Sequence, residues 1–458
     1  MTVNLPRLMV AAPASGSGKT TMILALLQAL QNRGLVPAAF KCGPDYIDPL
    51  FHRELLGVPG YNLDLFFSSP QVVRGLLAAG SRDADIALLE GVMGYYDGAG
   101  MTAQASSWHL SWETRTPTLL VLRPGGAALS VAAVVKGMLS LRRQHQIAGV
   151  LLTDCNPAMA QRLAPVIQRE CGIPVYGCLP RLPEAVLESR HLGLVTPGEV
   201  DGLREKVRRL AQALEQHADL DGLLALARTA PPLDGDLPSP EPVAWGVEIA
   251  VAKDEAFCFY YRENLELLEA LGARLRFFSP LHDRQLPPGA CGLYLGGGYP
   301  ELYIQALGEN EPMRRAVREA VAGGMPTLAE CGGFLYLQQQ LTDWAGGTHP
   351  MAQALAGESA PRDRLGRFGY ITLTAREDGL LGPRGTTLRG HEFHYWDSTH
   401  PGEGFEARKP HSNLQWTCGQ VSPTLYGGFP HLYFWSNPQA AARFVAAAAQ
   451  RRDRHEQD

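Results

Sequence analysis

The sequence predicts an α/β protein of two domains, the first of which is a parallel-sheet domain with a phosphate-binding loop (P-loop). Three observations support this fold class: the length of 458 residues, short apolar runs that alternate with helical patterns, and one break in composition. The break at residues 229–242 is rich in Pro and Asp and lacks periodicity, which is typical of a linker. We therefore expect domains at residues 1–228 and 243–450.

The expected strands of the first domain are apolar almost throughout, which is typical of parallel strands covered on both faces. The first, RLMVAA at 7–12, leads into a helical pattern at 20–34 that Gly34 closes. Further strands are expected at 35–41, 84–92, 116–124, 147–156 and 173–181, with helices between them.

The same alternation restarts after the linker and predicts a second α/β domain. Strands are expected at 247–254, 273–280, 291–298 and 325–331, with a helix at 260–272 and another before the last strand. The later part of this domain contains more Thr, Gly and aromatic residues.

Composition argues against several classes of protein. The net charge of −5 and the pI of about 6.2 do not favour a nucleic-acid partner. No apolar stretch is long enough to span a membrane, and no signal peptide is apparent, so we expect a cytoplasmic protein. The eight cysteines form no C-x-x-C pair, which argues against a zinc ribbon or a thioredoxin-type site, and their spread over a long chain argues against a disulfide scaffold.

Residues 12–21, APASGSGKTT, form a glycine-rich loop between the first strand and the first helix. In this setting backbone N–H groups and the helix N-terminus face phosphates, Lys19 neutralises charge and the Thr20 hydroxyl can hold Mg²⁺. Pro13 stands where the usual pattern has its first Gly, and the alternative is a turn that binds nothing. The expected ATP-binding residues are Ser15, Gly16, Ser17, Gly18, Lys19, Thr20 and Lys41.

Carboxylates follow two of the next strands, at the sheet edge where ligands of parallel sheets bind. Asp45 and Asp48 follow the second strand, Glu90 ends the third, and Asp97 comes shortly after it. Glu90 has the usual position of a carboxylate that orients Mg²⁺ or its water, and Thr20, Glu90 and Asp45 are the candidate metal ligands. Each Asp has an alternative interpretation as a turn former or helix cap, and Asp64 is a weaker candidate.

Cys331 stands between an apolar strand and an expected helix, in LAECGGFLYL. A thiol on such a turn is exposed, and the helix N-terminus is expected to lower its pKa. Gly332 and Gly333 leave backbone N–H groups for an oxyanion, and Gly297 and Gly298 of LGGGYPE are candidates for the second donor. The alternative is a buried structural cysteine.

A thiol nucleophile needs a base, and the sequence offers two groups of candidates. His431 lies in FPHLY, and His391 and His394 lie in RGHEFHY. Residues three apart in a strand point to opposite faces, so His391 and His394 cannot both face one thiol.

These motifs together resemble the cobyrinate a,c-diamide synthases, which are glutamine-dependent amidotransferases of corrin biosynthesis. The resemblance covers residues 5 to about 445. Its marks are APASGSGKTT, FKCGPDYIDPLFH, YNLDLF, LLEGVMGYYDG, GCLPR, RHLGLV, AFCFYY, LYLGGGYPE, LAECGGFLYL and RGHEFHY.

The resemblance implies an N-terminal ATP-dependent amidoligase domain similar to dethiobiotin synthetase and a C-terminal glutaminase domain of the class I type. It implies Cys331 as nucleophile and His431 as the residue that activates it. It also implies Lys19, Thr20 and Glu90 around Mg-ATP. Asp48 and Asp97, with Asp45, are expected near the carboxylates of the tetrapyrrole.

Two positions depart from the family pattern. The family commonly has His-Leu-His-Phe where this chain has His431-Leu432-Tyr433-Phe434. Class I glutaminases carry their third acid two residues after the His, where this chain has Tyr433, so we predict a Cys–His dyad. A strand that commonly ends in Asn-Arg reads Asp154-Cys155 here, which leaves adenine recognition unassigned.

The expected reaction uses both sites: Cys331 releases ammonia from glutamine, ATP phosphorylates a carboxylate, and ammonia displaces the phosphate. The expected substrate is cobyrinate, amidated at its a and c acetates. Hydrogenobyrinate and nickel sirohydrochlorin are alternatives, and a partition-type ATPase switch is the non-enzyme alternative. The sequence leaves the oligomeric state open, a homodimer included.

Overall fold

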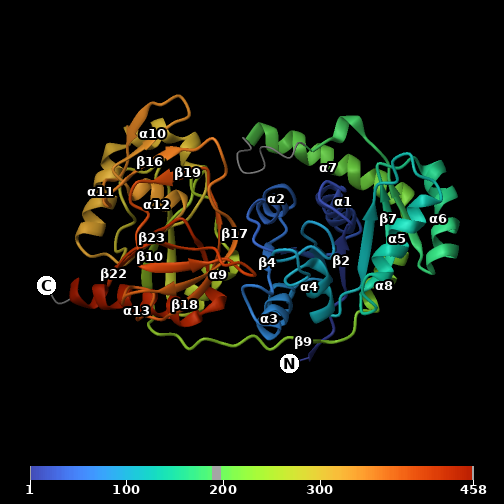
Figure 1. Cartoon of the computed structure of the whole chain (residues 1–458), viewed down its shortest axis with the longest axis horizontal. Coiled ribbons are helices and arrows are strands. Elements are labelled where there is room, and N and C mark those ends of the chain that lie inside the picture. Colours follow the sequence, from blue (N-terminus) through green and yellow to red (C-terminus); the bar gives the residue numbers. More distant parts are fainter. Residues whose placement is uncertain (1, 188–196, 456–458) are drawn as a thin grey trace. The chain divides into compact units, whose positions relative to one another are not determined.

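The computed structural model describes residues 2–187 and 197–455 of the chain (Figure 1). The RHLGLV segment lies outside the described residues. The chain divides into two compact units, residues 1–238 and 239–458. The predicted α/β class is confirmed in both units.

The first unit contains a seven-stranded parallel sheet with the order β4-β3-β5-β2-β6-β7-β8. Its strands are β2 (Arg7–Ala11), β3 (Pro37–Cys42), β4 (Gly60–Leu63), β5 (Ile86–Glu90), β6 (Thr118–Leu122), β7 (Ile147–Thr153) and β8 (Val175–Leu179). The order places β5 between β3 and β2, so the loops that follow these three parallel strands meet at one edge of the sheet.

Helices connect the strands, as parallel pairing requires. They are α1 (Lys19–Asn32), α2 (Ile47–Leu56), α3 (Pro70–Gly80), α4 (Ser107–Glu113), α5 (Ser130–Ser140), α6 (Pro157–Cys171), η1 (Pro183–Ala185), α7 (Pro197–His217) and α8 (Leu220–Arg228). Helices α1, α7 and α8 share one hydrophobic core with side chains of alternate strand positions such as Leu8 and Val10. Burial of this face holds α1 against the sheet, after the loop of residues 12–18 that follows β2.

The segment that the sequence predicts as a linker contains a short strand of the first unit. Strand β9 (Leu233–Asp234) pairs antiparallel with β1 (Thr2–Val3). The buried guanidinium of Arg7 donates hydrogen bonds to the carbonyls of Thr114 (2.8 Å) and Pro231 (2.8 Å). These bonds hold part of the Pro-rich segment against the first unit.

The second unit has a main sheet of six strands with the order β11-β10-β12-β13-β23-β22, parallel except for the pair β22 and β23. Its strands are β10 (Val247–Ala252), β11 (Ala273–Phe278), β12 (Gly292–Leu295), β13 (Thr327–Glu330), β22 (Gln420–Ser422) and β23 (Leu425–Gly428). The four expected strands of this unit are thus neighbours in the sheet, with β11 at its edge.

Two further sheets account for the part rich in Thr, Gly and aromatic residues. An antiparallel sheet contains β17 (Phe368–Ala375), β18 (Thr387–Phe393), β20 (Phe405–Arg408), β21 (Gln415–Cys418) and β24 (His431–Tyr433). A mixed sheet contains β14 (Gln340–Thr342), β15 (Thr348–Pro350), β16 (Glu358–Pro361) and β19 (Trp396–Ser398).

The helices of the second unit pack around the main sheet. They are α9 (Arg262–Ala270), η2 (Pro300–Leu302), α10 (Ile304–Glu309), α11 (Glu311–Ala322), α12 (Gly332–Leu337), η3 (Phe434–Ser436) and α13 (Pro438–His455). The core contains Leu293, Leu295 and Ala329 from the strands and Phe334 from α12. This packing fixes the turn between β13 and α12.

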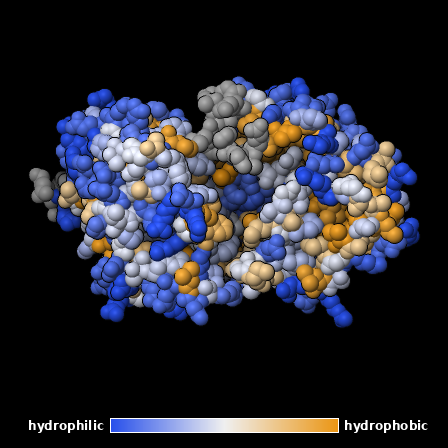
Figure 2. All heavy atoms as spheres, turned by 45° about the horizontal axis from the view of Figure 1, so that its top comes forward, coloured by the Kyte–Doolittle hydropathy of each residue, from blue (hydrophilic) through white to orange (hydrophobic). Residues whose placement is uncertain are grey.

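Hydrophilic side chains cover most of the face shown in Figure 2, and apolar patches interrupt them. Large exposed apolar side chains include Leu129, Leu141 and Trp245. Within residues 2–187 and 197–455, every helix is too short or too polar to cross a membrane.

Candidate active sites

The glycine-rich loop connects β2 to α1, as the sequence predicts. Gly16 and Gly18 have φ angles of +74° and +87°, which favour glycine and let the backbone curl ahead of the helix. The Lys19 ammonium donates hydrogen bonds to the carbonyls of Ala14 (3.1 Å) and Met93 (2.5 Å). Burial, and then the charge of Lys41, lower the pKa of Lys19 to about 8. The loop therefore holds a poorly solvated ammonium at the start of α1.

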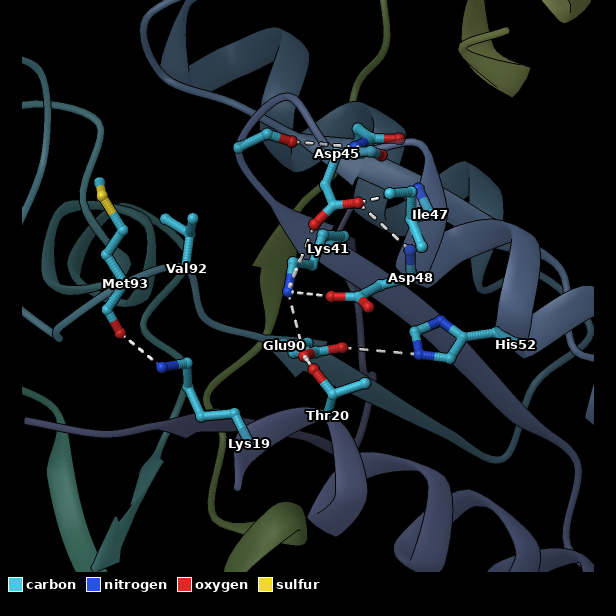
Figure 3. Close-up of polar contacts among 12 residues, drawn as sticks. Lys19, Thr20, Lys41, Asp45, Ile47, Asp48, His52, Glu90, Val92 and Met93 are labelled. Atoms are coloured by element: carbon cyan, nitrogen blue, oxygen red, sulfur yellow. Dashed lines mark hydrogen bonds and ion pairs between the residues drawn. The ribbon is translucent and has the colours of Figure 1, made fainter. Parts of the chain in front are cut away.

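Lys41 is the centre of a buried cluster of charges (Figure 3). Its ammonium forms ion pairs with Asp48, with Glu90 Oε1 at 3.0 Å and with Asp45 Oδ2 at 3.8 Å. Burial alone would lower the pKa of Lys41, but the three carboxylates outweigh burial and raise it. Lys41 thus stays charged, and most of its charge is already balanced by the protein.

Glu90 joins this cluster to the glycine-rich loop. Its Oε1 accepts a hydrogen bond of 2.6 Å from the Thr20 hydroxyl, and its Oε2 lies 3.6 Å from Nε2 of His52 (Figure 3). Burial would raise the pKa of Glu90, but Lys41, His52 and Thr20 together lower it well below its usual range. The carboxylate is therefore ionised.

Thr20 and Glu90 fit a role in holding Mg²⁺. Within the described residues, Glu90 Oε2 is buried and accepts no hydrogen bond, and no group of three or more His, Cys, Asp or Glu side chains could enclose a metal ion. A carboxylate and a hydroxyl next to a phosphate loop are the protein's usual share of a nucleotide-bound Mg²⁺, to which phosphates and water supply the rest.

The other predicted carboxylates also stabilise local backbone turns. Asp45 Oδ1 accepts hydrogen bonds from the N–H groups of Ile47 (2.8 Å) and Asp48 (3.2 Å) at the start of α2. Asp97 accepts a hydrogen bond of 3.0 Å from the Gly94 N–H, and its charge acts on Lys19. Asp64, the weaker candidate, accepts hydrogen bonds from backbone N–H groups of its own turn.

Figure 3 shows the Lys41 ammonium between Asp45 and Glu90. Asp45 therefore differs from Thr20 and Glu90, which contact each other directly. Its assignment as a metal ligand remains a prediction. Ser17 uses its hydroxyl to donate to the Ala14 carbonyl at 2.9 Å, which stabilises the loop itself.

Cys331 occupies a sharp turn between β13 and α12. Its φ angle of +46° is unusual for a residue with a side chain, and its N–H donates a 2.8 Å hydrogen bond to the Gly428 carbonyl of the neighbouring strand β23. The side chain is buried, and the Gly332 N–H contacts its sulfur. This geometry is that of a nucleophile elbow.

Three of the predicted glycines meet at the elbow. A Cβ built on Gly332 would lie 3.2 Å from the Gly298 nitrogen, and one built on Gly297 would lie 2.3 Å from Cε1 of His431. In the described chain the Gly298 N–H donates to no backbone carbonyl. The segment Gly297–Gly298 therefore lies between Cys331 and His431, with an N–H available for an oxyanion. The N–H of Gly333 is not available, contrary to expectation, because it donates to the Gly296 carbonyl at 2.9 Å.

His431 reaches the elbow through its contact with Gly297, whereas the Cys331 thiol itself donates to the Phe393 carbonyl at 3.9 Å. Strand β23 pairs with β13, which precedes Cys331, and His431 starts β24 only three residues after β23 ends. Burial, and then His391 and His394, lower the pKa of His431 to about 3. The imidazole is therefore neutral and retains a basic nitrogen.

The alternative bases have other contacts. His391 pairs with His431 across β18 and β24, and burial lowers its pKa to about 4. His394 stacks its ring on Phe429 with centroids 3.9 Å apart, and its Nδ1 donates to the Trp396 carbonyl at 2.6 Å. These contacts give His394 a packing role.

Sequence reasoning missed one carboxyl group of this site, Glu330. Its Oε2 lies 3.9 Å from Nδ1 of His431, and its Oε1 accepts a 3.3 Å hydrogen bond from the Leu432 N–H. Burial raises the pKa of Glu330 to about 8. Glu330 thus lies where a third acid would orient the imidazole, whereas Tyr433 packs its ring against Tyr261. The signal in the sequence was its position at the end of a strand, directly before the nucleophile.

The resting state of Cys331 differs from expectation. Burial and the charges of Glu301, Glu392 and Glu330 raise the pKa of the thiol, and the Gly332 N–H offsets only part of this effect. The six-residue helix α12 does not lower it overall. The structure therefore holds a neutral thiol near a neutral imidazole, not an ion pair.

Comparisons with known proteins find relatives of both units. Residues 8–194 match the CobQ/CobB/MinD/ParA nucleotide binding domain, and residues 248–439 match the CobB/CobQ-like glutamine amidotransferase domain. A cobyrinate a,c-diamide synthase of Dehalococcoides mccartyi (strain CBDB1) is 38% identical over 97% of this chain and 98% of its own length. A protein of the same name from Salmonella typhimurium is 38% identical over 96% of this chain and 97% of its own length. Another, from Caldanaerobacter subterraneus, is 36% identical over 95% of this chain and 97% of its own length.

Fold and sites together define an amidating ligase in which a nucleotide-binding unit is joined to a glutamine amidotransferase unit. The chain belongs to the cobyrinate a,c-diamide synthase family. Members of this family amidate a precursor of cobalamin with ATP and glutamine as substrates.

Proposed function

We propose that this protein amidates the a and c acetate side chains of cobyrinate with ammonia from glutamine, at the expense of ATP. The observation that carries the proposal is the presence of two separate sites in one chain, a phosphate loop beside ionised Glu90 and a cysteine elbow beside His431. The relatives named cobyrinate a,c-diamide synthase cover nearly the whole chain, so both sites fall within the similarity.

The second unit releases ammonia. Neutral His431 takes the thiol proton as the Cys331 sulfur attacks the amide carbon of glutamine, and the N–H groups of Gly298 and Gly332 stabilise the oxyanion. Collapse of this intermediate expels ammonia and leaves a thioester, which water hydrolyses to glutamate. Because proton transfer accompanies attack, a raised thiol pKa is compatible with turnover.

The first unit activates the carboxylate. Lys19 binds the transferring phosphoryl group, and Thr20 and Glu90 would hold Mg²⁺, which supplies charge neutralisation when bound. The substrate carboxylate attacks the γ-phosphorus of ATP, ADP leaves, and ammonia then displaces phosphate from the acyl phosphate. Two cycles give the diamide, with one ATP and one glutamine consumed per amide.

Lys41 has a different role in this scheme from Lys19. Its ion pairs with Asp48, Glu90 and Asp45 keep it in place, so it orients these side chains, and its charge holds the pKa of Glu90 below its usual range. Asp48 and Asp97 remain the candidate contacts to the tetrapyrrole.

The test is reconstitution of the reaction with purified protein, ATP, Mg²⁺, glutamine and a panel of cobyrinate, hydrogenobyrinate and nickel sirohydrochlorin. Mass spectrometry should show two carboxyl-to-amide conversions of cobyrinate, with stoichiometric ADP and glutamate. Preferred turnover of another tetrapyrrole would reassign the substrate. ATP hydrolysis without any glutaminase activity would favour the partition-type ATPase switch.

A further inference from the structure

We infer that Glu301 recognises glutamine: its carboxylate receives the α-ammonium group of the substrate whose amide is attacked by Cys331. The inference rests on the proposed glutaminase function and names a residue that selects the amino acid. Neither the motif analysis nor the comparisons assign a role to Glu301.

The position of Glu301 follows from the loop after β12. This loop contains Gly297 and Gly298, and the short helix η2 follows it directly. Pro300 packs over the elbow, since a Cβ built on Gly332 would lie 2.9 Å from its Cδ. The turn is closed by a 3.0 Å hydrogen bond from the Leu302 N–H to the Tyr299 carbonyl. Glu301 is therefore fixed beside the nucleophile by backbone contacts.

Electrostatics place three carboxyl groups near the thiol. Glu301, Glu392 and Glu330 all raise the pKa of Cys331, and Glu301 has the largest effect among them. Glu330 and Glu392 are completely buried, whereas Glu301 is partly exposed. Of the three, Glu301 is therefore the one that solvent reaches, and it directly follows Pro300, which packs on the elbow.

The three carboxyl groups also differ in their partners. Glu330 accepts the Leu432 N–H, and the cations Arg367 and Lys409 act on Glu392. Burial raises the pKa of Glu301 to about 7, and only its own N–H opposes that effect. In the described part of the chain no cationic side chain acts on the pKa of this carboxyl group. A ligand with a positive charge could form an ion pair with the Glu301 carboxylate.

Glutamine brings such a charge at a suitable place. Its α-ammonium is separated from the reacting amide by a short aliphatic chain, so a carboxylate beside the nucleophile can bind one end while Cys331 attacks the other. An amide that lacks the ammonium would leave Glu301 without a partner. Recognition of the α-ammonium therefore provides selection against other small amides.

The experiment compares glutamine with glutaramate, which is glutamine without its α-amino group. Glutamate or glutarate release is measured for the parent protein, Glu301→Gln and Glu301→Asp, and kcat/KM is determined for each substrate. Where glutaramate is hydrolysed too slowly to measure, its inhibition constant against glutamine gives the same comparison. Glu309→Gln, an exposed change on the following helix, is the matched control.

We expect the preference of the parent for glutamine over glutaramate to fall by about tenfold or more in Glu301→Gln, as for a lost hydrogen bond between charged groups. Glu301→Asp should keep part of the preference and Glu309→Gln all of it. If Glu301 had only a structural role, its substitution would lower kcat/KM for glutamine and for glutaramate by the same factor. An unchanged ratio of the two kcat/KM values would therefore overturn the inference. Absence of glutaminase activity in the parent would instead overturn the proposed function.

Discussion

The imidazole of His431 occupies the space that a side chain on Gly297 would need, because a Cβ on Gly297 would lie 2.3 Å from Cε1 of the ring. This contact connects the loop after β12 to the first residue of β24. It makes the glycine a requirement for the position of the base, in addition to any role of its backbone in binding the oxyanion.

We predict that Gly297→Ala abolishes glutamine-dependent amidation, since the added methyl displaces His431 from the elbow. Amidation with high concentrations of ammonia should continue, because the first unit is unchanged. Both rates are measured as tetrapyrrole amide formed per minute. Gly379→Ala, where a Cβ would meet only ordinary contacts of 3.5 Å or more, is the control and should retain both activities.

Cys331→Ala should likewise lose glutamine-dependent synthesis and keep synthesis from free ammonia. The physical reason is that the thiol takes part only in ammonia release, while Lys19 and Glu90 belong to a separate site. Equal loss with both nitrogen donors would contradict a two-site mechanism.

The strands that carry the first site were predictable because parallel strands buried on both faces are apolar throughout. Strand β4 was not predicted as a strand, since it is short and contains Asn62, whose side chain donates to the carbonyls of Gly43 and Asp45. The antiparallel sheet around β18 was foreseen only as a strand-like stretch at RGHEFHY. Three of its strands, β20, β21 and β24, have only three or four residues, and β24 pairs with β18 through residues far away in the sequence, such as His391 and His431.

The same limit explains what was missed at the second site. Glu330 meets the Leu432 N–H across more than a hundred residues, and no spacing within the sequence reveals that contact. The state of Cys331 was also mistaken, because an elbow indicates a helix N-terminus but not how deeply the sulfur is buried. The motifs identified the reacting groups, but their protonation states depend on burial, which the sequence does not reveal.

Alkylation of Cys331 by iodoacetamide should be slow at neutral pH and should accelerate only in alkaline solution. The folded pKa of the thiol is raised above 9.0, so the thiolate is scarce at pH 7 and increases as the pH rises. The labelling rate is followed by peptide mass spectrometry. Fast labelling at pH 7 with a plateau below pH 9 would contradict a neutral resting pair.

His431→Ala should abolish glutaminase turnover and reduce alkylation at neutral pH, because it removes the basic nitrogen at the elbow. His391→Ala should leave the alkylation rate close to that of the parent. His394→Ala should do the same, although it removes a stacked ring and a hydrogen bond from the core. If His394→Ala slowed alkylation and His431→Ala did not, the role of base would pass to His394.

Lys41→Met should destabilise the first unit by about 3–5 kcal/mol, since it leaves Asp48 and Glu90 buried without their shared cation. The free energy of unfolding is measured by urea denaturation. The folded pKa of Glu90 is below its ordinary value of 4.5, so this contribution is complete above pH 4.5 and is lost as the pH falls further. Lys136→Met, at an exposed ion pair, should change stability by about 0.5 kcal/mol or less.

ATP binding should be accompanied by proton uptake at Lys19. The pKa of Lys19 is lowered to about 8 by burial and by Lys41, so at pH 9 the ATP-free protein holds this amine mostly uncharged. Phosphates at the loop favour the ammonium form, which raises the pKa, and binding must then take a proton from the buffer. Lys41 does not contribute, because its pKa is raised and it stays charged throughout. Calorimetric titration with ATP in two buffers of different ionisation enthalpy should show uptake that approaches one proton at pH 9 and is small at pH 7.

Lys19→Arg, which is charged at both pH values, should show no such uptake, and Lys19→Ala should lose amidation with either nitrogen donor. Equal proton uptake in the parent and in Lys19→Arg would show that another group titrates on binding and that the loop does not bring Lys19 to the phosphates.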